Sequence, residues 1–190
     1  LLTKKGQYLE ISLLEAAITY TVWESAGYFA TGDIAEPLGS SHRNSAPYQA
    51  LKTKDGHINV GAPNQSNWER FADAIQRSDL IARNDFKDNA SRLVNRESLE
   101  AELELTLKTK NSSDWLEVLE KSGVPAGPIL NISEVWNDPQ VEARNMKVTL
   151  DHPTAGKITN IGLAAKLYGT PGRITKPAPL FGEHTREVLI

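Results

Sequence analysis

The stretch "APYQALKTKDGHINVGAPNQSNWERFADAI", residues 46–75, carries the strongest structural signals in the chain. Two short runs, Tyr48 to Thr53 and His57 to Gly61, are typical of β-strands. They flank Lys54-Asp55-Gly56, where the Asp-Gly pair tolerates the positive φ angles that a tight turn requires. Beyond the hairpin, apolar residues recur at helical spacing at Trp68, Phe71, Ala72 and Ile75. The stretch therefore predicts a β-hairpin followed by a helix, with Ser66 and Glu69 as its capping box.

The segment before the hairpin predicts a strand that leads directly into a helix. Gln7 to Ser12 partly alternates apolar and polar residues, as a short strand does. Ser12 and Glu15 form a capping box, since hydroxyl and carboxylate each satisfy a free backbone donor of the first turn. The helix is expected to end before Gly32, and its apolar face contains Leu14, Ala17, Ile18 and Val22. A strand joined to a helix in this way indicates an α/β layer.

The two ends of the sequence resemble interrupted helices. Lys4-Lys5-Gly6 is typical of a helix end, because cations near the negative end of the helix dipole precede a glycine. Glu183 to Ile190 stops on apolar residues while a helical pattern is still running. We therefore expect the chain to be a piece of a larger protein.

Further along the chain, capping residues and prolines mark the remaining elements. Helices are expected after Asn95 and after Ser112 or Ser113, the second ending at Gly123. Val124 to Ile129 must be extended because it contains two prolines. Short helices are predicted at Ser133 and at Asp138, where Pro139 takes the first helical position. Met146 to Leu167 is typical of a strand, a turn and two further strands.

The composition excludes several classes of protein. With 39% hydrophobic and 24% charged residues, the 190-residue chain resembles an ordinary soluble globular protein. Its net charge of −3 and scattered cations argue against nucleic acid or membrane surfaces as partners. No apolar run is long enough to span a membrane. The absence of cysteine excludes disulfides, a thiolate nucleophile and a Cys-ligated metal.

The search for chemistry leaves one candidate loop. No pair among His42, His57, His152 and His184 has the spacing of a helical metal site, so no metal is expected. GxSxG, P-loop and GxGxxG motifs are absent. Core anchoring is the default interpretation of Trp68, Trp115 and Trp136. From the residues alone, the chain is an α/β protein with one candidate pocket loop before the hairpin, at Gly39 to Ala46.

Five stretches together resemble the family III coenzyme A transferases, which include formyl-CoA and carnitine CoA transferases and their racemase relatives. They are "KKGQYLEISLLEA", residues 46–75 quoted above, "SGVPAGPILNISEVWNDPQVEARN", "LDHPTAGKI" and "PAPLFGEHTREVL". They follow the family order and span nearly the whole chain. No single stretch is a catalytic signature, but five in register indicate the family.

The resemblance implies an α/β fold made of an α+β small domain and part of a Rossmann-like large domain. Residues 1–32 would be partial large domain, with the end of a helix, a strand and a helix. Residues 33–45 would be a linker and pocket loop, and residues 46–145 the small domain. Residues 146–190 would return to the large domain. Family members form interlocked homodimers, so the resemblance implies this assembly for the full-length protein.

The resemblance also implies the chemistry. In this family an aspartate attacks the acyl-CoA carbonyl, forms a mixed anhydride and releases CoA, which later returns for the new acyl group. That aspartate would lie roughly 15 to 25 residues, one helix length, upstream of Leu1. No catalytic residue is therefore expected in this chain, and the chain alone is expected to be inactive. The substrates would be a CoA thioester and a carboxylic acid, with no permanently bound cofactor, in the cytoplasm or, in a eukaryote, the mitochondrial matrix.

The pocket loop Gly39, Ser40, Ser41 and His42 takes the place of the family's glycine-rich loop, which keeps water from the anhydride. Only Gly39 is a glycine here, so a tetraglycine closing loop is not present. Tyr48, Gln49 and Asn64 are candidates to line the substrate. Asn64 stands where racemase relatives carry a glutamate, and a carboxamide cannot act as a general base or general acid at neutral pH. This favours acyl transfer over the alternatives, a 2-methylacyl-CoA racemase and a non-catalytic partial domain.

Overall fold

The computed structural model describes residues 6–190 and divides into two compact units, one ending at Ala126 and one comprising Gly127–Ile190. The expected helix end at Leu1 to Lys5 lies outside the described residues. Both units mix helices and strands, as the sequence predicts. Within the described part of the chain, no helix is long and apolar enough to cross a membrane.

The predicted hairpin is confirmed. Strand β1 (Tyr48–Lys52) pairs antiparallel with β2 (His57–Gly61), with Tyr48 opposite Gly61 and Lys52 opposite His57. The sheet order is β1-β2-β3, where β3 (Ala126–Pro128) lies in the segment predicted to be extended. The N–H of Gly61 donates to the carbonyl of Pro125 at 2.8 Å, and the N–H of Ala62 donates to the carbonyl of Pro47 at 2.9 Å. Gly61, at the end of β2, therefore bonds to the chain just before β3, and the next residue, Ala62, bonds to the chain just before β1.

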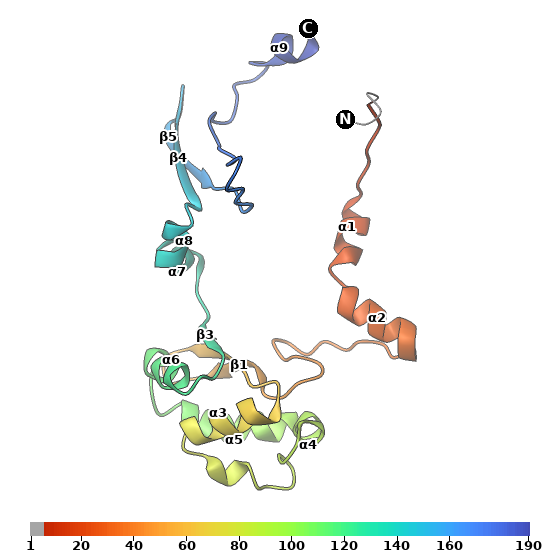
Figure 1. The fold of residues 1–190 in the computed structure, drawn as a ribbon, viewed down its shortest axis with the longest axis vertical. Helices are drawn as coiled ribbons and strands as arrows, with labels where there is room; N and C mark the ends of the chain where they lie inside the picture. Colours follow the sequence, from red (N-terminus) through yellow and green to blue (C-terminus); the bar gives the residue numbers. More distant parts are fainter. Residues whose placement is uncertain (1–5) are drawn as a thin grey trace. The chain divides into compact units, whose positions relative to one another are not determined.

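Helices cover this sheet and supply most of the core. Figure 1 shows α3 (Gln65–Ala74), α4 (Asn89–Val94), α5 (Arg96–Leu107) and α6 (Ser112–Lys121) gathered around β1, and a short 3-10 helix, η1 (Ser78–Leu80), follows α3. The buried apolar side chains of the described residues all lie between Ala46 and Val124. They include Leu51, Ile58, Trp68, Phe71, Leu99, Leu103 and Leu107. The alternating strand residues and one face of each long helix thus form one core.

Some predicted helix caps are wrong. Helix α3 is capped by Asn64, whose side-chain oxygen accepts from the N–H of Asn67, so it begins before the predicted Ser66–Glu69 box. Helix α6 follows Asn111 rather than Ser112 or Ser113. In both cases several adjacent residues are good caps, and the packed position of the helix selects among them. Asn95 does precede α5, but its side chain makes no capping hydrogen bond and donates to the carbonyls of Asp85 and Ser91 instead. Gly123 follows α6 with a φ of +64°.

The chain before the hairpin contains two helices, where the sequence predicts one. The capping box of Ser12 and Glu15 is confirmed at the start of α1 (Leu13–Thr19). Helix α2 (Val22–Thr31) ends at Gly32, which has a φ of +79°. The predicted strand from Gln7 to Ser12 is wrong, since this segment is irregular. No strand among residues 6–190 pairs with it, and a lone strand leaves its backbone groups unpaired.

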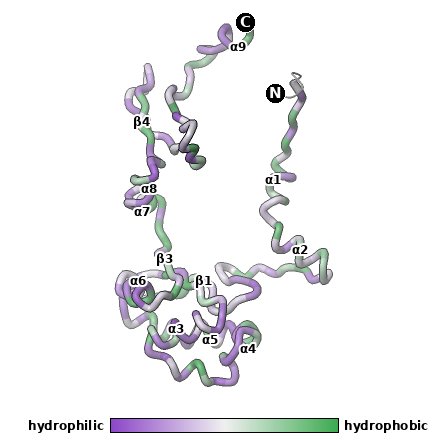
Figure 2. Tube along the Cα trace, viewed as in Figure 1, coloured by the Kyte–Doolittle hydropathy of each residue, from purple (hydrophilic) through white to green (hydrophobic). Residues whose placement is uncertain are grey.

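The predicted apolar face of this segment is exposed. Leu14, Ile18 and Val22 are each more than half accessible to solvent, as are their apolar neighbours Leu13 and Trp23. Figure 2 shows hydrophobic positions, in green, recurring along this part of the trace. The helical pattern is thus present without a packing partner in the described structure.

The second unit contains short elements in the predicted order. Helix α7 (Ile132–Trp136) is capped by Asn131 and Glu134, and α8 (Pro139–Ala143) by Asp138, with Pro139 first as expected. Strands β4 (Lys147–His152) and β5 (Gly156–Ile161) form an antiparallel hairpin. The expected third strand, up to Leu167, is wrong, because residues 162–167 are irregular. The predicted terminal helix is present as α9 (Thr185–Leu189).

Candidate functional site

The predicted pocket loop folds back along the edge of β1. Gly39 adopts a φ of +60°, a conformation that favours glycine, and turns the chain into the loop. The hydroxyl of Ser40 accepts a hydrogen bond from the N–H of Ala50 at 3.1 Å. The N–H of His42 donates to the carbonyl of Tyr48 at 2.9 Å. The loop and strand are therefore held side by side, and the loop residues from Ser40 to His42 lie next to Tyr48 and Gln49.

His42 and Tyr48 form a stacked pair. Their ring centroids are 5.1 Å apart and the ring planes differ by only 5°. The Nδ1 atom of His42 accepts from the N–H of Asn44 at 3.1 Å. In the neutral ring, Nδ1 is then the acceptor and Nε2 carries the proton. His42 remains solvent-exposed.

Gln49 connects the loop to the helices behind it. Its side chain is buried, and its Oε1 accepts from the Ser41 hydroxyl at 3.1 Å. Its Nε2 donates to a carboxylate oxygen of Glu100 at 2.8 Å. Both ends of the amide are therefore engaged within the protein, and the loop, β1 and α5 share one hydrogen-bonded chain.

Three side chains from α4 and α5, which sequence reasoning missed, contact the backbone of the same loop. Asn89 Nδ2 donates to the carbonyl of Asn44 at 2.9 Å, and its Oδ1 accepts from the N–H of Ala46 at 3.1 Å. The Nε of Arg92 donates to the carbonyl of Ala46 at 2.6 Å. The Nη2 of Arg96 donates to the carbonyl of His42 at 2.9 Å and to that of Arg43 at 3.3 Å. Their spacing of three and four residues along the sequence was the one signal that they share a side of the helices.

Asn64 lies at the end of the hairpin as the N-cap of α3. Its Oδ1 accepts from the N–H of Asn67 at 2.8 Å. A carboxamide in this position stabilises the helix start and does not act as a general acid or base near neutral pH. The geometry thus gives Asn64 a structural role, apart from the loop network.

A hollow lies beside the loop in the same unit. It is about 670 Å³ and is lined by Leu38 and Arg43 of the loop region and by residues 93–98 of α4 and α5. Arg43 pairs through Nε with Glu24 at 2.8 Å. Arg96 keeps one shielded atom, Nη1, without a hydrogen-bond partner among the described residues. Two arginines and Glu97 therefore line the open space on this side of the loop.

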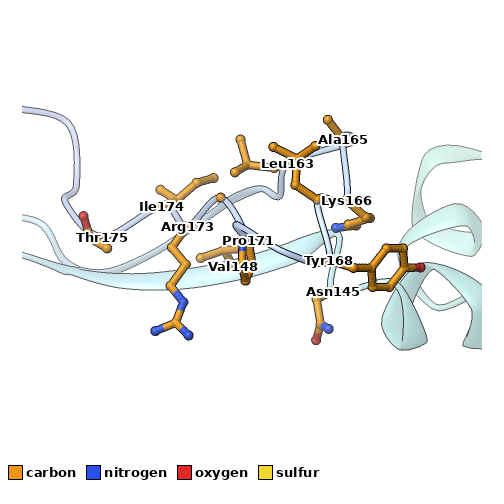
Figure 3. A pocket seen from close by; sticks show the side chains of 12 residues that line it. Asn145, Val148, Leu163, Ala165, Lys166, Tyr168, Pro171, Arg173, Ile174 and Thr175 are labelled. Carbon is orange, nitrogen blue, oxygen red and sulfur yellow. The ribbon is translucent and has the colours of Figure 1, made fainter.

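A separate hollow lies in the second unit, between β4 and the irregular chain that follows β5. It is about 510 Å³ and is lined largely by apolar side chains such as Val148, Leu163 and Pro171. In Figure 3 the guanidinium of Arg173 extends away from Leu163 and Ile174. The lining contains no carboxylate or histidine. Its titratable side chains are those of Lys166, Tyr168 and Arg173, none of which offers a carboxylate nucleophile.

Ionised groups elsewhere have structural partners. Glu102 accepts from Arg77 at 2.9 Å and from Arg83 at 2.7 Å, and these hydrogen bonds hold the pKa of Glu102 below its usual range. Burial lowers the pKa of Arg92. Within residues 6–190, no group of three or more His, Cys, Asp or Glu residues is arranged to hold a metal ion.

Comparison with known proteins identifies the class. Residues 2–185 match CoA-transferase family III, and the chain belongs to this family. It is 34% identical over 187 residues to human succinyl-CoA:glutarate CoA-transferase, covering 98% of this chain and 43% of that protein. It is 32% identical to succinyl-CoA:mesaconate CoA-transferase of Haloarcula hispanica, covering 98% of this chain and 47% of that protein. A CAIB/BAIF family protein from Brucella suis has a similar structure, with a TM-score of 0.80 and 28% identity. The match covers 98% of this chain and 48% of that one. The chain thus spans about half the length of these relatives.

Proposed function

We propose that this chain forms part of an enzyme that transfers CoA from an acyl-CoA to a carboxylic acid. The family match over residues 2–185 is the observation that carries this proposal. Similar proteins are named as transferases acting on succinyl-CoA with glutarate or mesaconate. We infer a dicarboxylic acid and its CoA thioester as the substrate class. The reaction would take place where acyl-CoA is found, in the cytoplasm or the mitochondrial matrix, in an interlocked homodimer.

The proposed reaction begins with an aspartate supplied by a segment before Leu1. Its carboxylate oxygen attacks the thioester carbonyl, the C–S bond breaks, and CoA leaves as a thiolate. The product is a mixed anhydride, which water hydrolyses readily. Residues 1–32 and 146–190 would complete a Rossmann-like large domain, residues 33–45 would be the pocket loop, and residues 46–145 the small domain.

In this scheme the loop from Gly39 to His42 forms the wall that keeps water from the anhydride. Its attachment to β1 supports that role, since the Ser40 hydroxyl and the His42 N–H both bond to strand backbone. Tyr48 and the exposed ring of His42 present a stacked, partly apolar surface beside the loop. Gln49 contributes to the wall by holding Ser41 in place, since both ends of its amide are already hydrogen-bonded within the protein.

The racemase alternative requires a group that removes the α-proton of the acyl chain. Asn64 stands where the racemase relatives carry a glutamate, and its oxygen is engaged with the N–H of Asn67. We therefore expect no deuterium uptake at the α-carbon of a 2-methylacyl-CoA incubated with the full protein in D₂O. Uptake faster than in the enzyme-free control would favour the racemase.

The transferase proposal is tested by trapping the anhydride. The full encoded protein is incubated with succinyl-CoA, and the anhydride is captured with hydroxylamine and located by peptide mass spectrometry. We expect modification of one aspartate before Leu1 and transfer of CoA to added glutarate. The chain from Leu1 to Ile190 alone, as a control, is expected to give neither. Modification of a carboxylate within residues 1–190, or turnover by this chain alone, would contradict the proposal.

A further inference from the structure

Three polar side chains on one side of the pocket loop form hydrogen bonds to its backbone, and we call them the polar stripe. Asn89, Arg92 and Arg96 lie three and four residues apart across the junction of α4 and α5. Their donors bond to the carbonyls of four loop residues, His42, Arg43, Asn44 and Ala46. Side chains from two consecutive helices thus bind the main chain of the loop and not its side chains.

The three members of the stripe differ in how firmly they are tied to the core. Arg92 is fully buried, lies over the Trp68 ring at 5.1 Å and also bonds to the Phe86 carbonyl at 3.0 Å. It therefore belongs to the hydrophobic core as well as to the loop. Arg96 is only partly buried, and the bonds of its Nη2 atom go to the loop alone. Arg96 is the member whose removal affects the loop with least damage to the fold.

We propose that Arg96 is a positioning residue for the acyl-transfer reaction. By joining the carbonyls of His42 and Arg43 it fixes the loop in one place over the reacting groups, with Asn89 and Arg92 anchoring the end of the loop at Ala46. This proposal rests on the function proposed above. In this proposal, side chains of α4 and α5 hold the loop in place. The loop contains a single glycine, so these contacts take the place of the flexibility that a glycine-rich loop would have.

A guanidinium suits this task because of its shape. It is planar, permanently charged, and presents several N–H groups in fixed directions, so one group can serve two adjacent carbonyls. A lysine ammonium keeps the charge but has no planar fork. Lysine at this position should therefore hold the loop less firmly than arginine and more firmly than alanine.

The test uses the full encoded protein and three variants, Arg96→Ala, Arg96→Lys and Lys108→Ala. Lys108 is the matched control, because it is a cation at the end of the same helix that pairs with Glu104 and not with the loop. The first measurement is hydrogen exchange at the amides of residues 39–46. We expect exchange about tenfold faster in Arg96→Ala, an intermediate increase in Arg96→Lys, and no change in Lys108→Ala.

The second measurement separates hydrolysis of the acyl-CoA from CoA transfer to an added carboxylate. In Arg96→Ala the share of hydrolysis is expected to rise several-fold and kcat for transfer to fall, while KM for the acyl-CoA stays within about twofold. A merely structural role would lower both rates equally. Unchanged loop exchange, or faster exchange with an unchanged share of hydrolysis, would overturn the proposal for Arg96. Absence of transfer by the unmodified protein would instead show that the proposed function itself is wrong.

Discussion

The carboxylate of Asp55 accepts two hydrogen bonds from Ser112, one from the backbone N–H at 2.8 Å and one from the hydroxyl at 2.9 Å. Asp55 occupies the hairpin turn, and Ser112 is the first residue of α6. The negative charge thus satisfies a free donor at the positive end of the helix dipole. The turn and the helix are joined across 57 residues of sequence by one side chain.

The Asp55 contact should make stability depend on pH. The hydrogen bond from the Ser112 N–H is the main cause that lowers the pKa of Asp55 in the folded state. Since the folded pKa is below the unfolded one, the stabilisation is complete above about pH 4, the usual range of aspartate, and is lost as the pH falls further. We expect Asp55→Asn to lower the Tm at pH 7 and to differ less from wild type at pH 3. A difference that does not change with pH would contradict this account.

Glu102 should contribute through its two arginine partners. Replacement by glutamine keeps the shape but removes the charge that Arg77 and Arg83 share, and we expect a loss of about 1 kcal/mol in the free energy of unfolding at pH 7. The lowered pKa of Glu102 means that this difference fades as the pH falls below about 4.3. Glu117→Gln, in an exposed pair with Lys121, is the control and should change little. Urea unfolding at pH 7 and pH 3.5 measures both variants, and equal losses in the two would refute the prediction.

Two leucines of α5 provide a matched test of the core. Leu103 is fully buried, whereas Leu105 is 68% exposed on the same helix. Leu103→Ala leaves a cavity and should cost about 2–5 kcal/mol. Leu105→Ala should change the stability by less than about 0.5 kcal/mol. Chemical denaturation of both variants measures the difference, and similar values would mean that α5 does not pack on the sheet as described.

Asn64 is expected to act only as a helix cap. Aspartate retains an oxygen acceptor for the Asn67 N–H, so Asn64→Asp should leave the stability close to that of wild type. Asn64→Ala removes the cap and should cost about 1 kcal/mol. Thermal unfolding distinguishes the two. If both variants showed the expected stability but the full protein lost transfer activity in each, Asn64 would have a direct part in the reaction.

The local elements could be predicted from the sequence where one signal dominated. Asp55-Gly56 placed the hairpin turn, and Ser12 with Glu15 placed the start of α1, because each depends on residues within one or two turns of chain. The start of α3 was predicted two residues late, since Asn64 and Ser66 are both competent caps. The strand predicted at Gln7 to Ser12 failed because a strand needs a partner that local alternation does not supply.

The candidate loop could be located from its composition, but its attachments could not. The bond of Ser41 to Gln49 and the stacking of His42 on Tyr48 follow from the loop turning back along β1. The contacts of Asn89 and Arg96 span more than 40 residues of sequence. A polar stripe on a helix normally faces solvent, so only the packing of α4 and α5 against the loop shows what it binds.

The pairing of Pro47 and Pro125 with the adjacent residues Ala62 and Gly61 has an evolutionary consequence. The chain enters and leaves the hairpin-and-helix core at neighbouring points, and the buried side chains of that core come from the uninterrupted run between Ala46 and Val124. A module with adjoining ends can be spliced into a host protein while the flanking residues stay close together. Its loop and its polar stripe can then change in sequence without rebuilding the host.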